Sequence, residues 1–320
     1  MQLTPIIFGT SCLGNLYKVV PFETKVALAA EWFKAFARPV IDSAGKYGAG
    51  LSLACIGAAL RALGKRPGDL AISVKLGWRR ARRLAPGEEP TFEPGVWAGL
   101  EWDAVQDISH DGILRCYAEA EELLGGYPID LVSVHDPDEH LAAKGADAAL
   151  DDICGAYAAL FELKARGAVK GVGIGAKDGR VIERLWRAGV KFDWAMFACA
   201  PTLLAHPPEL LAFVRELKAA GVTLIDSAVF NGGFLTGGEM LDYRRADPVA
   251  DAAAFAFRDR YLALCRAHGL DPAAPAVEYA YRLGFDAVAL NTSSPRRILQ
   301  NAAYATARAG DAFWRALSPN

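Results

Sequence analysis

Four ionisable side chains have types that together could transfer a proton at a carbonyl group. Asp42, Lys75 and His135 each directly follow a short apolar run, and Tyr47 lies five residues beyond Asp42. A phenol has a pKa of about 10 in water, and a neighbouring ammonium group lowers that value. We expect Tyr47 to exchange a proton with a substrate oxygen, Lys75 to supply the charge, Asp42 to hold Lys75, and His135 to orient the oxygen. Each residue alone could be structural, and their joint occurrence favours catalysis.

These side chains need a scaffold that brings separate strand ends together. Short apolar runs alternate with segments in which apolar residues recur every three or four positions, the pattern of strands alternating with helices. The expected strands are Pro5–Phe8, Pro39–Ile41, Leu70–Val74, Leu131–Val134, Val169–Ile174, Trp194–Phe197, Val222–Ile225 and Ala287–Leu290. The expected helices include Glu23–Ala37, Ser52–Leu63, Gly112–Leu124, Leu150–Arg166, Gly179–Ala188 and Pro208–Ala220. Eight such units favour a closed (β/α)8 barrel, and no change in composition divides residues 1–320, so we expect one barrel domain.

Two connections, at about residues 76–111 and 231–255, are longer than usual and follow strands. In a barrel they would lie on the C-terminal face, where active sites are built. The first contains Trp78, Trp97 and Trp102, whose rings could pack against a substrate or only within the loop. Four arginines directly after Trp78 either form a solvated surface or attract an anionic group to the mouth.

The composition excludes several other classes. Hydrophobic residues make up 52% of the chain and charged residues 22%, with a net charge of −2. This balance is typical of a globular protein and gives no field that would attract nucleic acid or an anionic membrane. No secretory signal or membrane helix is visible, so we expect a cytoplasmic protein. The six cysteines and five histidines are scattered, so we expect neither disulfides nor a metal site.

A glycine-rich string offers an alternative to the barrel. Residues Gly171–Ala176 satisfy the GxGxxA form of the dinucleotide-binding fingerprint, and Asp193 follows about twenty residues later. In an open nucleotide-binding sheet that acid must end the next strand, where it can reach the ribose. Asp193 instead precedes the apolar run Trp194–Phe197. The barrel is therefore favoured, with the open sheet as the alternative.

The segment Ile41–Gly48, which reads Ile-Asp-Ser-Ala-Gly-Lys-Tyr-Gly, resembles the Asp-Thr-Ala-x-x-Tyr-Gly signature of the aldo-keto reductase superfamily. Lys75 and His135 fall where that family has its lysine and histidine, and the resemblance covers nearly the whole chain. It implies an aldo-keto reductase type of barrel with NADP or NAD lying across its mouth. It also implies that Asp42, Tyr47, Lys75 and His135 form the catalytic tetrad.

The same resemblance implies which residues bind the cofactor. They are Thr10, Asp42, Ser227, Phe230, Asn231, Gly232, Gly233, Thr292, Ser293, Arg297 and Asn301. Arg297 can reach a ribose phosphate or stack on adenine. Asn291 replaces the lysine that often precedes Thr292, so NADP and NAD both stay open. At the nicotinamide end the sequence departs from the family, because residues 175–178 and 198–201 lack the usual polar or aromatic groups.

Several strings are similar to the D-threo-aldose 1-dehydrogenase and L-fucose dehydrogenase group of that family. They are Leu13–Tyr17, Tyr47–Ser52, Asp107–Gly112, His135–Asp138 and Phe230–Gly233. The similarity implies a small-molecule substrate, an aldose such as L-fucose or D-arabinose that is oxidised at C1 to a lactone. We expect Tyr47, Trp78 and His135 to contact it. Pyridoxal or another aldehyde is the alternative substrate, and a non-enzymatic nucleotide-binding barrel with a regulatory role is the alternative of another class. The oligomeric state stays open.

Overall fold

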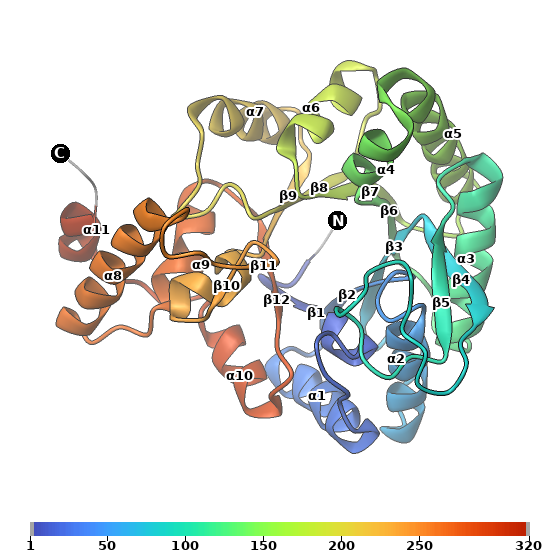
Figure 1. Ribbon diagram of the computed structural model, residues 1–320, viewed down its shortest axis with the longest axis horizontal. Helices are drawn as coiled ribbons and strands as arrows, with labels where there is room; N and C mark the ends of the chain where they lie inside the picture. Colours follow the sequence, from blue (N-terminus) through green and yellow to red (C-terminus); the bar gives the residue numbers. More distant parts are fainter. Residues whose placement is uncertain (1–2, 318–320) are drawn as a thin grey trace.

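The computed structural model describes residues 3–317, and its centre is a closed barrel of eight parallel strands (Figure 1). Around the barrel the strand order is β1-β12-β9-β8-β7-β6-β3-β2. The strands are β1 Ile6–Gly9, β2 Val40–Ala44, β3 Ala71–Leu76, β6 Leu131–His135, β7 Gly171–Ala176, β8 Trp194–Ala198, β9 Thr223–Ser227 and β12 Ala287–Asn291. The predicted (β/α)8 barrel is therefore confirmed. Each strand runs one to three residues past its predicted end, so Asp42, Lys75 and His135 belong to the strands themselves.

Helices surround the strands as an outer ring (Figure 1). Those that match the six predicted helices are α1 Phe22–Ala35, α2 Leu51–Ala62, α3 His110–Leu124, α5 Ala146–Ala165, α6 Gly179–Arg187 and α7 Pro208–Ala219. The others are α4 Pro137–Lys144, α8 Ala252–Ala267, α9 Ala273–Arg282, α10 Pro295–Ala303 and α11 Asp311–Leu317, with short 3-10 helices η1 Ser11–Gly14 and η2 Asn231–Thr236. Among the helices within residues 3–317, none has the length and apolarity that crossing a bilayer requires.

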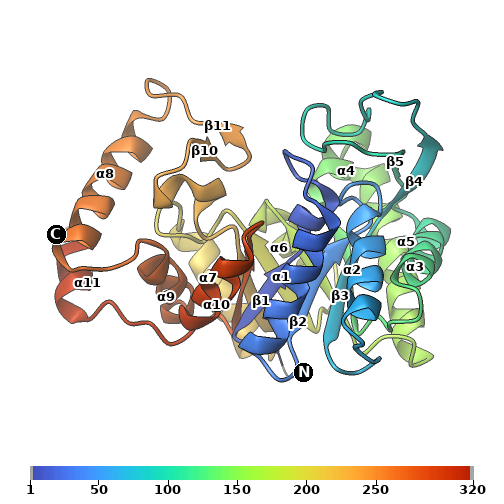
Figure 2. The same cartoon turned by 90° about the horizontal axis from the view of Figure 1, so that it is seen from below.

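Both long connections are folded. The first forms an antiparallel hairpin of β4 Trp78–Arg83 and β5 Trp102–Gln106, and the second a short hairpin of β10 Met240–Leu241 and β11 Arg244–Arg245. Figure 2 shows both hairpins at the end of the barrel opposite the N-terminus. On β4, Arg79 pairs with Asp107 at 2.6 Å, and other arginines pair with acids of the same hairpin. This arginine cluster is thus neutralised locally, which favours the surface role over attraction of an anion.

The glycine-rich string is the whole of β7, and its glycines make room for side chains inside the barrel. A Cβ atom at Gly173 would lie 2.1 Å from the ring of Trp194, and one at Gly175 would lie 3.1 Å from Cδ of Lys75. Asp193 lies at the N-terminal end of β8, where it pairs with Lys164. The dinucleotide-fingerprint interpretation is therefore wrong, and the glycines are needed for packing.

A repeated carboxylate contact ties the N-terminal ends of the strands together. Asp130, Asp193 and Asp286 directly precede β6, β8 and β12. The carboxylate of each accepts a hydrogen bond from a backbone N–H near the start of the neighbouring strand. The donors are the backbone N–H groups of Ile72 at 3.0 Å, Val172 at 2.8 Å and Leu224 at 2.8 Å. Each carboxylate also pairs with a lysine, namely Lys170, Lys164 and Lys218 respectively. We call these three contacts the carboxylate clamps.

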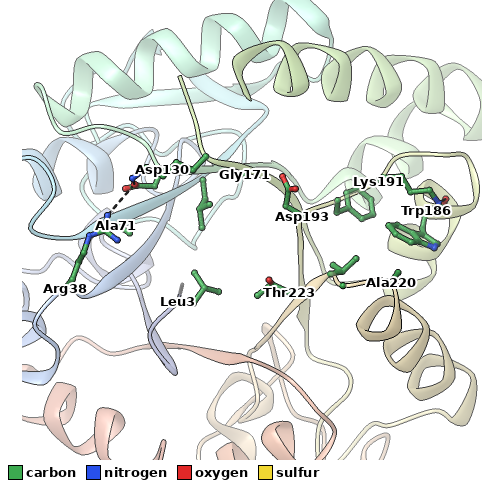
Figure 3. Close-up of a pocket in the computed structure, with 15 residues that line it drawn as sticks. Leu3, Arg38, Ala71, Asp130, Gly171, Trp186, Lys191, Asp193, Ala220 and Thr223 are labelled. Atoms are coloured by element: carbon green, nitrogen blue, oxygen red, sulfur yellow. Dashed lines mark hydrogen bonds and ion pairs between the residues drawn. The ribbon is translucent and has the colours of Figure 1, made fainter. Parts of the chain in front are cut away.

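A cavity of about 620 Å³ opens at this same end of the barrel (Figure 3). Asp130 and Asp193 lie at its edge, and Leu3, Phe192 and Thr223 are among the other residues that line it. None of its lining residues is one of the predicted site residues. The hollow therefore lies at the end of the barrel that parallel (β/α)8 enzymes use for stability rather than for catalysis.

Candidate active site

The structure brings the four predicted catalytic residues together at the C-terminal ends of three neighbouring strands. The ammonium group of Lys75 on β3 donates a hydrogen bond to Asp42 on β2, and the Ser73 hydroxyl donates another to Asp42 at 3.1 Å. The Lys75 nitrogen lies 5.0 Å from the centre of the Tyr47 ring. The Tyr47 and His135 rings meet edge-on with their centroids 5.5 Å apart. The Tyr47 phenol therefore has both a cation and an imidazole next to it.

Burial sets the protonation states of this group. It raises the pKa of Tyr47 above its ordinary value, and the opposing charge of Lys75 does not fully compensate. Lys75 lowers the pKa of this phenol as expected, but burial outweighs it, so a pKa below the ordinary value is not found. Burial disfavours the charged form of Lys75, but Asp42 raises its pKa. Burial and the charges of Lys75 and Lys46 hold the pKa of His135 well below its usual value. At neutral pH the site therefore presents a protonated phenol, a charged ammonium and a neutral imidazole.

Beside the tetrad lies a charged network that the sequence did not reveal. The ammonium of Lys46, whose side chain is 4% exposed, lies 2.8 Å from Glu139, 2.9 Å from Glu93 and 3.8 Å from Asp136. Lys177 pairs with Asp136 at 3.2 Å and with Glu139 at 2.9 Å. The sequence offered one signal for this network, because Lys46 directly precedes Tyr47 and Asp136 directly follows His135. Of the partners of Lys46, Glu139 lies on α4 just after Asp136, whereas Glu93 lies in the β4–β5 connection, which the chain order does not place beside Lys46.

An aromatic wall borders the phenol on the side of the β4–β5 connection. The Trp97 ring lies 5.8 Å from the Tyr47 ring, Phe92 lies 6.4 Å from Trp97, and Trp78 lies 5.9 Å from Phe92. Trp102 instead packs beneath the guanidinium groups of Arg80 and Arg83 on the hairpin. Of the three candidate tryptophans, Trp78 and Trp97 thus belong to the wall, and Trp102 stabilises the hairpin.

The predicted cofactor residues near β1 and β9 mostly use their polar groups within the protein. The Thr10 hydroxyl is fully buried and donates to the Asp42 carbonyl at 2.9 Å, so any contribution of Thr10 is indirect. The Ser227 hydroxyl donates to the Phe197 carbonyl at 2.8 Å. The Asn231 amide donates to the Cys199 carbonyl at 3.2 Å, and its oxygen is buried with no partner in the part of the chain that the structure describes.

The loop after Phe230 is shaped by two glycines. Gly232 and Gly233 have φ of 71° and 95°, in the left-handed region that glycine adopts without steric cost. A Cβ atom at Gly233 would meet nothing within 4 Å, so the backbone there faces open space. This segment could approach an extended ligand closely. The side-chain groups that usually hold a nicotinamide carboxamide are absent from Gly175 and Ala176 at the end of β7.

The predicted adenosine end lies at the start of α10. Thr292, Ser293 and Ser294 lead into the helix, and the Thr292 hydroxyl accepts a hydrogen bond from the Ser294 N–H at 3.2 Å. Arg297 and the buried Asn301 follow on the helix, and Arg297 has no acidic partner within residues 3–317. A helix N-terminus with an unpaired guanidinium is suited to a phosphate. The residues present therefore fit the adenosine end of a dinucleotide better than its nicotinamide end.

The comparisons with known proteins agree with this geometry. The Aldo/keto reductase family matches residues 5–317. The chain is 30% identical to pyridoxal 4-dehydrogenase of Microbacterium luteolum, over 99% of this chain and 94% of that protein. It is 29% identical to D-threo-aldose 1-dehydrogenase of a Pseudomonas species, over 97% and 92%.

Solved structures show the same fold at low identity. A glycerol dehydrogenase from Gluconobacter oxydans superposes with a TM-score of 0.72 at 17% identity, over 99% of this chain and 91% of that chain. An aldo-keto reductase from Bacillus halodurans in its holo form has a TM-score of 0.65 at 20% identity, over 96% and 88%. With the family match over nearly the whole chain, these findings identify the protein as an NAD(P)-dependent oxidoreductase that belongs to the aldo/keto reductase family.

Proposed function

We propose that this protein oxidises an aldose at C1 to the lactone, with Tyr47 as the acid/base group. The observation that carries the proposal is that both the Lys75 ammonium and the His135 imidazole lie against the Tyr47 ring. The aldose assignment rests on the similarity to D-threo-aldose 1-dehydrogenase. Pyridoxal is the second candidate, because a relative of equal similarity is a pyridoxal 4-dehydrogenase and the aromatic wall suits a planar ring.

The chain's own residues divide the proton transfer among them. A nicotinamide cofactor, when bound, exchanges a hydride with the reacting carbon. During oxidation the Tyr47 oxygen takes the proton of the sugar hydroxyl, and during reduction the phenol returns it to the carbonyl oxygen. The Lys75 ammonium stabilises the phenolate, and Asp42 holds Lys75 in place. Neutral His135 and the wall residue Trp78 hold the substrate against Tyr47.

The cofactor assignment follows the fit described above. We infer that Thr292, Ser293, Arg297 and Asn301 hold the adenosine end. We infer that the segment from Ser227 to Gly233, which includes Phe230, Asn231 and Gly232, holds the middle of the cofactor together with Asp42, and that Thr10 contributes indirectly. Both NADP and NAD fit this arrangement. We also infer that residues 1–320 act as one barrel domain, because both long connections fold over the mouth of the same barrel.

The test follows absorbance at 340 nm with each cofactor and a panel of L-fucose, D-arabinose, pyridoxal and simple aldehydes. Lactone formation from an aldose supports the first proposal, and turnover of pyridoxal alone supports the second. A protein that binds NAD or NADP by fluorescence titration, yet turns over no sugar or carbonyl, would contradict both and support a non-enzymatic nucleotide-binding barrel.

A further inference from the structure

Lys46 and Tyr47 are neighbours in the chain, and a closed circuit of contacts links them through the β4–β5 connection. The Lys46 ammonium lies 2.9 Å from one oxygen of Glu93. The other Glu93 oxygen accepts the indole N–H of Trp97 at 2.6 Å. The Trp97 ring lies 5.8 Å from the Tyr47 ring, which returns the circuit to its start. Each side chain thus restrains the next one.

The ammonium at the base of this circuit is fixed from several directions. Glu139 of α4 contributes both carboxylate oxygens, at 2.9 Å and 2.8 Å, and Asp136 lies beside them at 3.8 Å. The nitrogen also lies 4.9 Å from the ring of Trp78. A buried cation with this many partners is held in one place, since moving it away from these carboxylates would leave its own buried charge unpaired. Glu93 is therefore held against a fixed charge.

Hydrogen bonds fix the backbone on either side of Trp97, but they do not set the orientation of the Trp97 ring. Val96 accepts from the Tyr17 N–H at 2.7 Å, and Ala98 donates to the Asn15 carbonyl at 3.0 Å. These bonds set the position of the chain. The one hydrogen bond that selects an orientation of the Trp97 ring is that from its N–H to Glu93. The Trp97 ring is buried against Phe92 and Tyr47, and the Glu93 carboxylate is the polar contact that fixes its orientation there.

We propose that Glu93, held by Lys46, is a positioning residue that keeps Trp97 against Tyr47 and so sets the wall on which the substrate packs. The proposal rests on the proposed function, because it assigns the Trp97 face to the substrate of that reaction. Aromatic faces pack against the C–H side of a sugar ring or against a planar heterocycle. Without Glu93, the indole N–H has no acceptor, the ring shifts within its packing against the phenol, and the substrate loses part of its binding surface.

The kinetic test uses Glu93→Ala and Glu93→Gln, with Glu88→Gln as the matched control. Glu88 lies in the same connection and pairs with Arg82 outside the circuit. Glu93→Ala is expected to raise KM for the sugar or aldehyde about tenfold, because a displaced Trp97 ring removes part of the aromatic surface against which the substrate packs. The expected kcat stays within about twofold and KM for the cofactor is unchanged. Glu93→Gln, which keeps an acceptor for the indole, is expected to recover part of the loss, and Glu88→Gln to behave as the wild type.

A general loss of folding would lower kcat in proportion to the active fraction and leave KM unchanged, and that result would overturn the proposal. An equal rise of KM in Glu88→Gln would overturn it too. A measurement without turnover separates this failure from failure of the proposed function. In protein labelled with 15N-tryptophan, the indole N–H signal of Trp97, assigned with Trp97→Phe, should shift in Glu93→Ala and in Lys46→Met but not in Glu88→Gln. An unshifted signal in Glu93→Ala contradicts the circuit whether or not the wild type is active.

Discussion

The backbone of Gly175 lies directly against the side chain of Lys75, so that a Cβ atom at Gly175 would come within 3.1 Å of the Lys75 Cδ atom. Lys75 cannot give way freely, because its ammonium is bound to Asp42. The absence of a side chain on β7 at this point therefore keeps the lysine in line with the phenol.

Gly175→Ala is expected to displace Lys75 by a few tenths of an ångström and to lower kcat by about tenfold to a hundredfold, since small misplacements of catalytic groups are costly. Steady-state kinetics with saturating cofactor measure the effect. Gly155→Ala is the control, because a Cβ atom there has its nearest neighbour at an ordinary 3.6 Å. If both variants keep wild-type kcat, the position of Lys75 is not limiting.

Tyr47→Phe is expected to lower turnover by about 10²- to 10⁴-fold, the usual contribution of a general acid/base group. Cofactor affinity should stay nearly unchanged, because the lost hydroxyl acts on the substrate. Fluorescence titration and 340 nm kinetics measure the two quantities. Tyr117→Phe removes a hydroxyl that bonds to Glu121 on α3 and serves as control. Wild-type turnover by Tyr47→Phe would remove the tyrosine from the mechanism.

The rate of oxidation should rise with pH. Burial raises the pKa of Tyr47 above its ordinary value of about 10, and only the phenolate can accept the substrate proton. The kcat/KM for oxidation is therefore expected to increase about tenfold per pH unit from neutral to moderately alkaline pH, because the phenolate fraction does so. Reduction uses the phenol and should stay flat over that range. An oxidation profile with its maximum near pH 7 would contradict this assignment.

Asp138 on α4 gives a stability prediction with a definite sign. Burial, followed by the charge of Asp136, raises its pKa to about 6, and one of its oxygens is buried with no partner in the described part of the chain. Between pH 4 and pH 6 the unfolded state therefore releases a proton that the folded state keeps, so this group destabilises the protein increasingly as pH rises. Asp138→Asn should raise Tm above pH 6 and leave it unchanged below pH 4. Thermal unfolding across this range is the measurement, with exposed Asp151→Asn as control.

The carboxylate clamps should affect stability and not catalysis. Asp193→Ala removes the acceptor of the Val172 N–H and the partner of Lys164, and is expected to cost about 1–2 kcal/mol. Asp193→Asn keeps an acceptor oxygen and should recover part of that loss. Urea unfolding measures both, and kcat at a temperature where both variants are folded should equal that of the wild type. A fall of kcat with unchanged stability would reverse this assignment of roles.

The barrel, and the meeting of Asp42, Tyr47, Lys75 and His135 at its mouth, could be predicted from the sequence because their signals are local. Apolar runs mark the strands, and parallel strands must end at the same face, so the placement of Lys75 and His135 at the mouth follows from their position after such runs. The network around Lys46 could not be predicted, since the path of the connection that carries Glu93 and the direction of the helix α4 that carries Glu139 both depend on tertiary packing. The upward shift of the Tyr47 pKa also depends on tertiary packing. Burial of the phenol outweighs the charge of Lys75, and the depth of burial cannot be read from residue order.

The three carboxylate clamps join β6 to β3, β8 to β7 and β12 to β9. All three lie at the end of the barrel that is farthest from Tyr47. Strand alignment is thereby secured on one rim while the opposite rim carries the loops that recognise substrate. Insertions, deletions or exchanges among those loops leave the anchoring rim untouched. Substitutions that change substrate specificity at the mouth should therefore cost the barrel little stability. This makes the loops at the mouth a favourable starting point for directed evolution.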